Sequence, residues 1–212
     1  MAETSKTPSL AEQAYELLEN RLVTLELAPG SIVSEGLLID MVGLGRTPVR
    51  EAMQRLAHQD MIRVMPRKCL MIVPVESTDM LHILEVRKRL ERLIVKLAAL
   101  NARDEQRSDL SAIARTLSFS HDSFEDFLEL DRELDTLLDD CAGNPFASAA
   151  VAPLRTHCRR FWFFNRHRLR LSDAIAAHGT MIRLIARRDY RGAQKASDGV
   201  IAVIERLVAA SG

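Results

Sequence analysis

Two short runs of β-forming residues interrupt a sequence whose apolar residues otherwise follow helical spacing, and they restrict the fold more than any other feature does. The runs cover residues 61–65 and 69–73. Between them lie Pro66, Arg67 and Lys68, so the connection is short and basic. Apolar and branched residues on both sides of such a connection predict a β-hairpin. The fold must therefore place a hairpin with a positively charged tip among helices.

Three helical segments precede this hairpin. The predicted helices are residues 9–25, residues 34–42 and a helix that opens at Thr47-Pro48. Ser34 is placed to cap the second helix, after a short extended piece at residues 31–33. Pro48 is tolerated because the first turn of a helix does not use its N–H group. Helices and hairpin in this order predict a winged helix-turn-helix over residues 8–76.

From about Ser77 onward the pattern is helical throughout. A long amphipathic helix is expected over residues 77–101, with Leu81 and Leu93 on its buried side. Further helices are expected at residues 104–117, 121–140, 145–168, 172–188 and 189–210. The fold class is therefore mainly α, with the winged helix-turn-helix (three helices plus a β-hairpin) followed by an all-helical antiparallel bundle over residues 77–212.

Composition and cysteine usage exclude several classes of protein. No apolar run approaches the roughly 20 residues that a membrane span needs, and the polar N-terminus lacks the apolar core of a signal peptide. Cys69, Cys141 and Cys158 match neither a disulfide framework nor a zinc motif. We therefore expect a cytoplasmic protein with reduced thiols and no membrane partner.

The formal net charge of zero conceals an asymmetry along the chain. Residues 1–76 carry 8 basic and 10 acidic side chains, and residues 77–152 carry 9 and 15. Residues 153–191 carry 10 basic and 2 acidic side chains, a net charge of +8. Total charge therefore argues neither for nor against a nucleic-acid partner, and the local pattern must decide.

The start of the third predicted helix has the side chains that a DNA-reading helix needs. Arg46 and Arg50 are four residues apart and share one helix face, from which arginine can bind guanine or phosphate bidentately. Thr47 can bind phosphate, which a helix N-terminus also favours. Residues 46–68 carry six basic and two acidic side chains. The alternative is a solvated, charged helix face beside an ordinary hairpin.

This order of elements resembles the winged-helix domain of the GntR family of bacterial regulators. The matching residues are Ala28-Pro29-Gly30, residues 43–52 (Gly-Leu-Gly-Arg-Thr-Pro-Val-Arg-Glu-Ala), Leu56, Val64 and Pro66-Arg67. The resemblance implies that Arg46, Thr47 and Arg50 contact the operator, and that the wing tip enters the minor groove. The residues that we predict to bind DNA are Arg46, Thr47, Arg50, Arg67, Lys68 and Ser34.

Two positions depart from the family pattern. Gly45 stands where the family usually has serine or threonine, which removes a possible phosphate contact. Cys69 stands at the wing tip, where the family usually has glycine, and its side chain can hinder close approach to the minor-groove floor. Either replacement could alter the preferred DNA sequence or weaken binding.

The helical part resembles the effector domain of FadR-type GntR regulators, the FCD form, over about residues 78–210. The matching segments are residues 83–91, 131–138, 143–145 and 178–193. Many such domains hold a divalent metal through an aspartate, a histidine one turn later and two further histidines. Asp131 and His178 match the first and third ligands, whereas Asp135 and Val200 stand at the other two positions.

The predicted cofactor is therefore a divalent metal (Zn, Mn, Ni or Mg) at Asp131, Asp135 and His178. Two carboxylates and one imidazole suit Mn²⁺ or Mg²⁺ better than a closed zinc site. The set is incomplete, because the valine at position 200 cannot ligate a metal. The alternative is that the two aspartates pair with arginines of the basic segment and that His178 is a satisfied pocket histidine.

The basic segment that begins at Arg155 also offers an anion site. Most of its arginines are expected to face solvent and one or two to point inward, where with Arg87 they could hold a carboxylate bidentately. The aromatic residues 161–164 are expected in the core or in a dimer interface. The predicted binding residues for a small organic-acid effector, which the resemblance implies, are Arg87, Asp131, Asp135, His178 and Arg159.

These features predict a ligand-responsive transcriptional regulator, with a repressor favoured, that binds a palindromic operator of double-stranded DNA as a homodimer. Effector binding would shift the population between DNA-competent and incompetent arrangements. One alternative is a metal-dependent enzyme, but no nucleophile or acid–base motif accompanies the metal set, so no enzymatic activity is expected. The other is a helical interaction module that has lost DNA binding, against which the intact Arg46, Thr47 and Arg50 speak.

Overall fold

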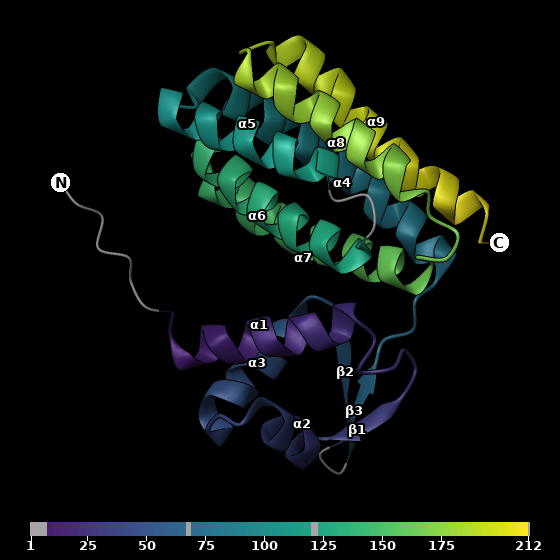
Figure 1. Cartoon of the computed structure of the whole chain (residues 1–212). Coiled ribbons are helices and arrows are strands. Elements are labelled where there is room, and N and C mark those ends of the chain that lie inside the picture. Colours follow the sequence, from purple (N-terminus) through teal and green to yellow (C-terminus); the bar gives the residue numbers. More distant parts are fainter. Residues whose placement is uncertain (1–7, 67–68, 120–122, 212) are drawn as a thin grey trace. The chain divides into compact units, whose positions relative to one another are not determined.

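The computed structural model describes residues 8–66, 69–119 and 123–211, and the contacts divide the chain into two compact units between Val75 and Glu76 (Figure 1). We call them the N-terminal unit and the helical unit. None of the helices in the described part of the chain combines the length and the apolar composition that a membrane crossing requires.

The N-terminal unit packs three helices against a small antiparallel sheet. Its elements are α1 (Leu10–Val23), β1 (Ile32–Ser34), α2 (Glu35–Val42), α3 (Arg46–His58), β2 (Ile62–Met65) and β3 (Cys69–Ile72). The strand order is β1-β3-β2, so the predicted hairpin gains a third strand from the extended piece before α2. Backbone hydrogen bonds from Gly30 N to Ile72 O (2.8 Å) and from Ile72 N to Ser31 O (2.9 Å) hold this strand in place.

Local signals explain where these helices begin and end. The hydroxyls of Ser9 and Ser34 accept hydrogen bonds from backbone N–H groups in the first turns of α1 and α2. α2 ends at Gly43 in the left-handed conformation (φ 70°), which glycine adopts without steric strain. The apolar sides of α1 and α3 then meet the sheet in one core, with Leu18, Leu22, Val49, Leu56, Met61 and Ile72 fully or almost fully buried.

The helical unit consists of antiparallel helices. Its elements are α4 (Ser77–Asn101), α5 (Asp104–Phe119), α6 (Phe124–Ala142), α7 (Pro145–Phe164), α8 (Leu171–Ala186) and α9 (Tyr190–Ala209). α4 is the central helix, since it packs against α6 and α7 and also against α8 and α9 (Figure 1). The mainly α fold class, a winged helix-turn-helix followed by a helical bundle, is confirmed.

Several helix ends differ from the sequence-based prediction by one or two residues, and the start of α6 and the end of α7 differ by more. α6 begins at Phe124 rather than at residue 121, because Ser123 caps it by accepting a hydrogen bond from Asp126 N at 3.1 Å. α7 ends at Phe164 rather than at residue 168, because the chain turns there, with Arg168 N bonded to Asn165 O at 2.9 Å.

The prediction that Leu81 and Leu93 are buried was wrong. Their side chains are 52% and 38% exposed. The buried side of α4 instead carries Arg87 and Glu91, together with apolar residues such as Ile94. A charged pair thus occupies the bundle-facing side of α4, and part of its leucine content faces solvent.

Candidate DNA interface and buried polar cluster

α3 separates its apolar residues from its polar residues on two sides. The buried side holds Val49, Ala52, Met53 and Leu56, which anchor the helix in the core of the N-terminal unit. Arg46, Thr47, Arg50 and Gln54 are exposed on the other side. Gly45 supplies no side-chain cap, and the first turn contains no acidic residue. The first backbone N–H groups of α3 and their positive dipole end are therefore available to an anion such as phosphate.

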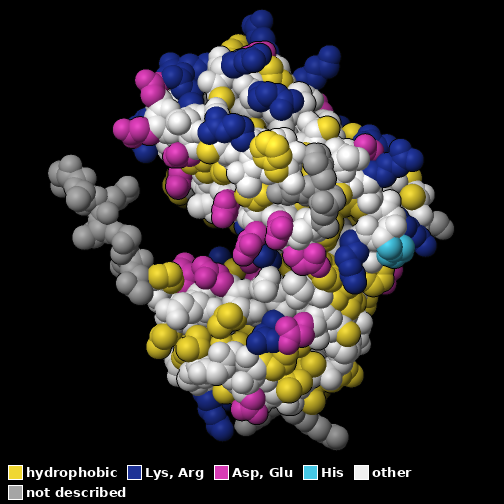
Figure 2. Space-filling view, in the orientation of Figure 1, with side chains coloured by type: hydrophobic (Ala, Val, Ile, Leu, Met, Phe, Trp, Pro, Cys, Tyr) yellow, Lys and Arg dark blue, Asp and Glu magenta, His cyan; other side chains and the backbone are white. Residues whose placement is uncertain are grey.

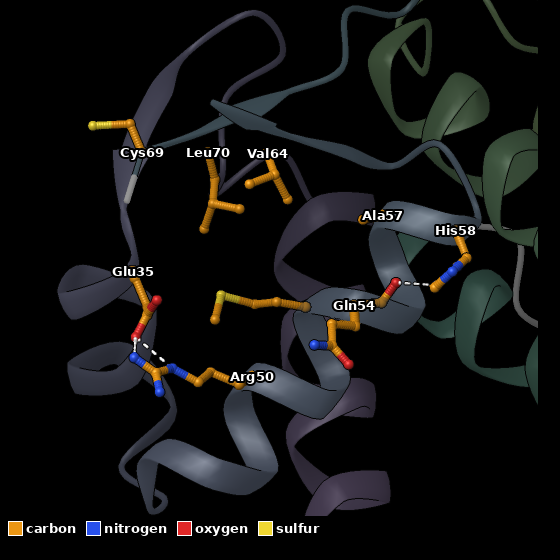
Figure 3. Close-up of a pocket in the computed structure, with 9 residues that line it drawn as sticks. Glu35, Arg50, Gln54, Ala57, His58, Val64, Cys69 and Leu70 are labelled. Carbon is orange, nitrogen blue, oxygen red and sulfur yellow. Dashed lines mark hydrogen bonds and ion pairs between the residues drawn. The ribbon is translucent and has the colours of Figure 1, made fainter. Parts of the chain in front are cut away.

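Arg50 is held by a carboxylate from the preceding helix. Its Nε and Nη2 atoms both lie 2.8 Å from Oε1 of Glu35 (Figure 3). The Arg50 side chain remains 50% exposed, so part of its guanidinium still faces solvent. The sequence analysis did not predict a role for Glu35. Its position directly after the capping Ser34 indicated only that it lies at the start of α2.

The remaining residues that were predicted to bind DNA lie outside α3. Ser34 is exposed, and its hydroxyl caps α2 by accepting from Leu37 N at 3.1 Å. Arg67 and Lys68 lie outside the described residues. Arg55, which contributes to the basic character of this region, stacks over the ring of Tyr15 at 3.6 Å and therefore lies against α1.

A cavity of about 580 Å³ lies between α3 and the hairpin, beside Arg50 (Figure 3). Its walls combine apolar side chains of the strands, such as Val64 and Leu70, with polar side chains of α3, such as Gln54. Cys69 also lines it and is half-buried. The hairpin and the exposed side of α3 thus border a single concave surface.

The helical unit contains a buried polar cluster built from four helices. Its members are Arg87 and Glu91 on α4, Asp131, Asp135 and Asp139 on α6, Arg155 and Arg159 on α7, and His178 on α8. Four of the five residues predicted to bind the effector are buried: the exposed fraction is 3% for Arg87, Asp131 and His178, and 7% for Arg159. The structure therefore brings together all five residues predicted for the effector site, since Asp135 also pairs with Arg159.

Arg159 lies between two carboxylates of α6. Its Nη1 atom is 3.1 Å from Oδ2 of Asp131 and 2.7 Å from Oδ2 of Asp135. The other oxygen of Asp131 lies 3.2 Å from Nε2 of His178. His178 Nδ1 is 2.8 Å from the carbonyl oxygen of Ala174, so this nitrogen donates and the imidazole is fixed at both ends.

Arg155 connects the remaining carboxylates. Its Nε atom lies 2.9 Å from Oε1 of Glu91 and 3.1 Å from Oδ1 of Asp135, and its Nη1 atom lies 3.0 Å from Oδ2 of Asp139. Arg87 contacts the same Glu91 oxygen at 3.1 Å. The cluster is thus a continuous ion-pair network, as buried charges require.

Burial and pairing act in opposite directions on the pKa values of this network. Burial raises the pKa of Glu91, but the charges of Arg155 and Arg87 outweigh it and bring that pKa down to about 2. Burial likewise opposes ionisation of Asp131, yet the hydrogen bond from His178 and the charge of Arg159 hold its pKa below the ordinary value. The pKa of His178 is raised, because its bond to Asp131 outweighs burial. Burial dominates at Asp135 and raises its pKa to about 6.

Little space remains inside the cluster. A residual cavity of about 10 Å³ lies beside Arg87, Asp135, His178 and Val200, which is room for about one water molecule. On the other side of His178, the rings of Phe127 and Trp162 meet the imidazole edge-to-face. An organic effector would therefore have to displace groups of the network.

The predicted metal-ligand set does not fit a divalent ion in this arrangement. Asp131 and Asp135 both face the guanidinium of Arg159, and Val200 offers no ligand atom. Among the described residues, no group of three or more His, Cys, Asp or Glu side chains is arranged to hold a metal. The geometry matches the alternative, in which the aspartates pair with arginines.

The sequence analysis missed Glu91 and Asp139 and did not single out Arg155. Glu91 carried a readable signal, since it lies four residues after Arg87 on the same helix face. The expectation for the basic segment was partly right, because Arg155, Arg159 and Arg160 are all buried, one more than expected. Phe161, Trp162 and Phe163 are also buried, so most of the aromatic run belongs to the core.

The exposed arginines of the helical unit include those near the α8–α9 junction, where Figure 2 shows blue side chains gathered.

Comparison with known proteins assigns both units to described families. Residues 10–72 match the bacterial regulatory proteins of the gntR family, and residues 82–202 match the FCD domain. The chain is 29% identical over 204 residues to the fatty acid metabolism regulator protein of Edwardsiella ictaluri, covering 87% of this chain and 84% of that protein. It is 28% identical over 104 residues to the transcriptional repressor GlaR of Escherichia coli, covering 49% of this chain.

The chain spans about half the length of two of these relatives: 47% of GlaR and 46% of a transcriptional regulator of Agrobacterium vitis. The fold is similar to that of E. coli McbR/YncC, with a TM-score of 0.84 and 18% identity over 97% of this chain and 99% of that one. The FCD match covers more than half of the chain and the gntR match lies over the winged helix. This chain therefore belongs to the GntR family of bacterial transcriptional regulators, in the group that carries an FCD domain.

Proposed function

We propose that this protein is a ligand-responsive transcriptional repressor that works in the cytoplasm and binds a palindromic operator as a homodimer. Residues 8–76 would bind DNA, and residues 77–212 would bind the effector and dimerise. The observation that carries the proposal is the exposed N-terminal side of α3, with arginines at positions 46 and 50 and an uncapped first turn. Because its families consist of regulators, an enzymatic role is not favoured.

Arg46, Thr47 and Arg50 would make the first contacts with DNA. An uncapped helix N-terminus binds phosphate through its N–H groups, and the two arginines beside it can bind phosphate or a guanine edge. Ser34 adds an exposed hydroxyl at the start of α2. Arg67 and Lys68 lie outside the described residues, and a minor-groove contact is proposed for them from the family resemblance alone. Repression itself is proposed because the relative GlaR is described as a repressor.

The homodimer is proposed from an apolar stripe on α4. The stripe residues alternate three and four positions apart, as in a heptad pattern, and are Ile83, Val86, Leu90, Leu93, Leu97 and Leu100. Val86, Leu93 and Leu100 are 52%, 38% and 49% exposed. The same stripe on a second copy would cover these side chains, and the two-fold axis would then present two α3 helices to two half-sites.

The effector is proposed to be a small carboxylate that enters the polar cluster. Arg87, Arg159 and His178 would bind its carboxylate, while Asp131 and Asp135 would give up their arginine partners. The residual cavity holds about one water molecule, so binding would require a rearranged state of the cluster. The effector would select this state and so shift the population away from the DNA-competent arrangement.

The test replaces the two arginines of α3. A duplex from upstream of the protein's own gene is used in a mobility-shift assay at moderate salt, where nonspecific binding fades. Arg46→Ala and Arg50→Ala should each weaken binding by about 1–3 kcal/mol, roughly 5- to 150-fold. Arg115→Ala removes an exposed arginine of α5 and should leave binding unchanged.

Two results would contradict the proposal. Wild-type protein that forms no specific complex with this duplex would argue against a DNA-binding role at its own gene. Wild-type and Arg46→Ala proteins that bind equally would support the helical interaction module instead.

A further inference from the structure

Two carboxylates of the polar cluster converge on one cationic group that belongs to the chain itself. We propose that, in the effector-free protein, the guanidinium of Arg159 is the cation of this cluster and stands where a divalent metal would otherwise bind. The proposal goes beyond the proposed function, because it concerns the helical unit alone and does not depend on DNA binding.

The contacts of Arg159 place its charge between the two candidate metal ligands of α6. Its Nη1 atom lies 3.1 Å from Oδ2 of Asp131 and 2.7 Å from Oδ2 of Asp135, both at hydrogen-bond distance. A metal ion shared by these carboxylates would need oxygens at about 2.0–2.6 Å in the same space. The guanidinium and the ion therefore compete for one position.

The charges around this position leave no excess negative charge that a divalent ion could neutralise. Among the described residues, the network contains four carboxylates (Glu91, Asp131, Asp135 and Asp139), three guanidiniums (Arg87, Arg155 and Arg159) and His178. Each carboxylate already contacts a basic side chain. A metal ion would bring two further positive charges next to buried guanidiniums, where repulsion is weakly screened.

Ligands and space are also lacking. His178 Nε2 is directed at Asp131 Oδ1 at 3.2 Å, and Nδ1 is taken by the carbonyl of Ala174. Val200 borders the residual cavity of about 10 Å³ and has no donor atom. While Arg159 fills the space between the aspartates, a hydrated metal ion therefore has no room for its own waters, which would have to replace the ligand that position 200 does not supply.

The proposal predicts that removal of the Arg159 charge creates a metal site. Arg159→Met removes the guanidinium and shortens the side chain, which frees the space between Asp131 and Asp135 for an ion and its waters. Arg115→Met, at an exposed position of α5, is the matched control. Each full-length protein is stripped with a chelator, and its Tm is then measured with and without MnCl₂, NiCl₂ or ZnCl₂, while bound metal is counted by elemental analysis.

Wild-type and Arg115→Met proteins should hold far less than one metal per chain and show no rise in Tm with any of the three salts. Arg159→Met should melt at a lower temperature without metal and regain roughly 5 °C or more with at least one salt. Stoichiometric metal in the wild-type protein, lost with a drop in Tm on chelation, would overturn the proposal. A folded Arg159→Met protein that ignores all three metals would overturn it as well.

Arg159→Lys covers the case in which the methionine variant does not fold. The ammonium keeps a positive charge between the aspartates, so this variant should stay metal-free and insensitive to the salts. If it instead binds metal stoichiometrically, the positive charge is not what excludes the ion and the proposal fails. DNA binding enters none of these measurements, so their outcome is separable from that of the proposed function.

Discussion

At the residue scale, the ion pair between Glu35 and Arg50 sets the orientation of a guanidinium at the proposed DNA interface. Both nitrogens contact one carboxylate oxygen at 2.8 Å, and half of the arginine side chain stays exposed. A fixed, partly neutralised arginine favours a defined contact over indiscriminate attraction to phosphate. Glu35 is thus a positioning residue for Arg50.

Glu35→Gln should therefore reduce discrimination rather than abolish binding. Loss of the charge frees Arg50 and removes a repulsion with phosphate, so nonspecific affinity should rise and the ratio of specific to nonspecific affinity should fall by about 1 kcal/mol, roughly 5-fold. Fluorescence anisotropy with the upstream duplex and a scrambled duplex over a range of salt measures this ratio. Glu16→Gln removes the same charge from the exposed side of α1 and is the control. An unchanged ratio in Glu35→Gln would refute the positioning role.

The Asp131–His178 pair makes a second residue-scale prediction, about pH. The folded-state pKa of His178 lies above the ordinary histidine value of 6.5, because its bond to Asp131 outweighs burial, so its contribution to stability is complete below about pH 6.5 and is lost as pH rises through the folded pKa. Asp131 has a lowered pKa, so its contribution is present above pH 3.8 and is lost as pH falls. The pair should therefore stabilise the helical unit most between about pH 4 and pH 6.5.

His178→Gln should lower the Tm most within that window and less at higher pH. Thermal unfolding followed by circular dichroism from pH 5 to pH 9 measures the difference from wild type. His167→Gln, at an exposed position after α7, should give no pH-dependent difference. A Tm difference that grows between pH 7 and pH 9 would show that the charged imidazole is not the stabilising form.

At the element scale, α4 has two chemically different sides. Toward α6 and α7 it contributes Arg87 and Glu91 to the polar cluster. Toward solvent it presents the apolar stripe that includes Val86, Leu93 and Leu100. A dimer formed through this stripe would place the effector site and the subunit interface on one helix, which offers a short route for coupling between them.

Leu93→Glu should dissociate the proposed dimer, because it would bury a charge in the centre of the stripe. We expect the dimer dissociation constant to rise by roughly 10- to 100-fold, about 1.5–3 kcal/mol. Analytical ultracentrifugation measures the constant, and circular dichroism checks that the variant is folded. Leu81→Glu changes another exposed leucine of α4, outside the stripe, and should remain dimeric. Equal dissociation constants for the two variants would exclude the stripe as the interface.

At the scale of the whole molecule, the two units differ in how far sequence could predict them. The N-terminal unit was predicted closely, because its helices and hairpin are bounded by local signals such as Ser34, Gly43 and Pro48. Its proposed DNA-binding side was predicted from the four-residue spacing of Arg46 and Arg50. Glu35 was missed, since its contact with Arg50 depends on the angle between α2 and α3.

For the helical unit, the helical spacing of apolar residues identified the helices but predicted some of their buried side chains wrongly. Leu81 and Leu93 read as core residues because a leucine on an amphipathic helix usually is one. The core instead encloses charged residues, and the burial of an arginine depends on carboxylates supplied by other helices. In the sequence, one expected metal ligand was missing. In the structure, Arg159 forms ion pairs with Asp131 and Asp135, so the charges of both aspartates are compensated without a metal.

The sequence by itself thus determined the order of elements, the family and the side of α3 that we propose reads DNA, because caps, turn residues and helical spacing act over a few residues. Only the tertiary structure decided which arginines turn inward and which carboxylates receive them. Arg155 and Glu91 are 64 positions apart, and Arg159 and Asp131 are 28 apart. Such pairs form only where helix packing brings the side chains together and removes water, and no local pattern encodes that geometry.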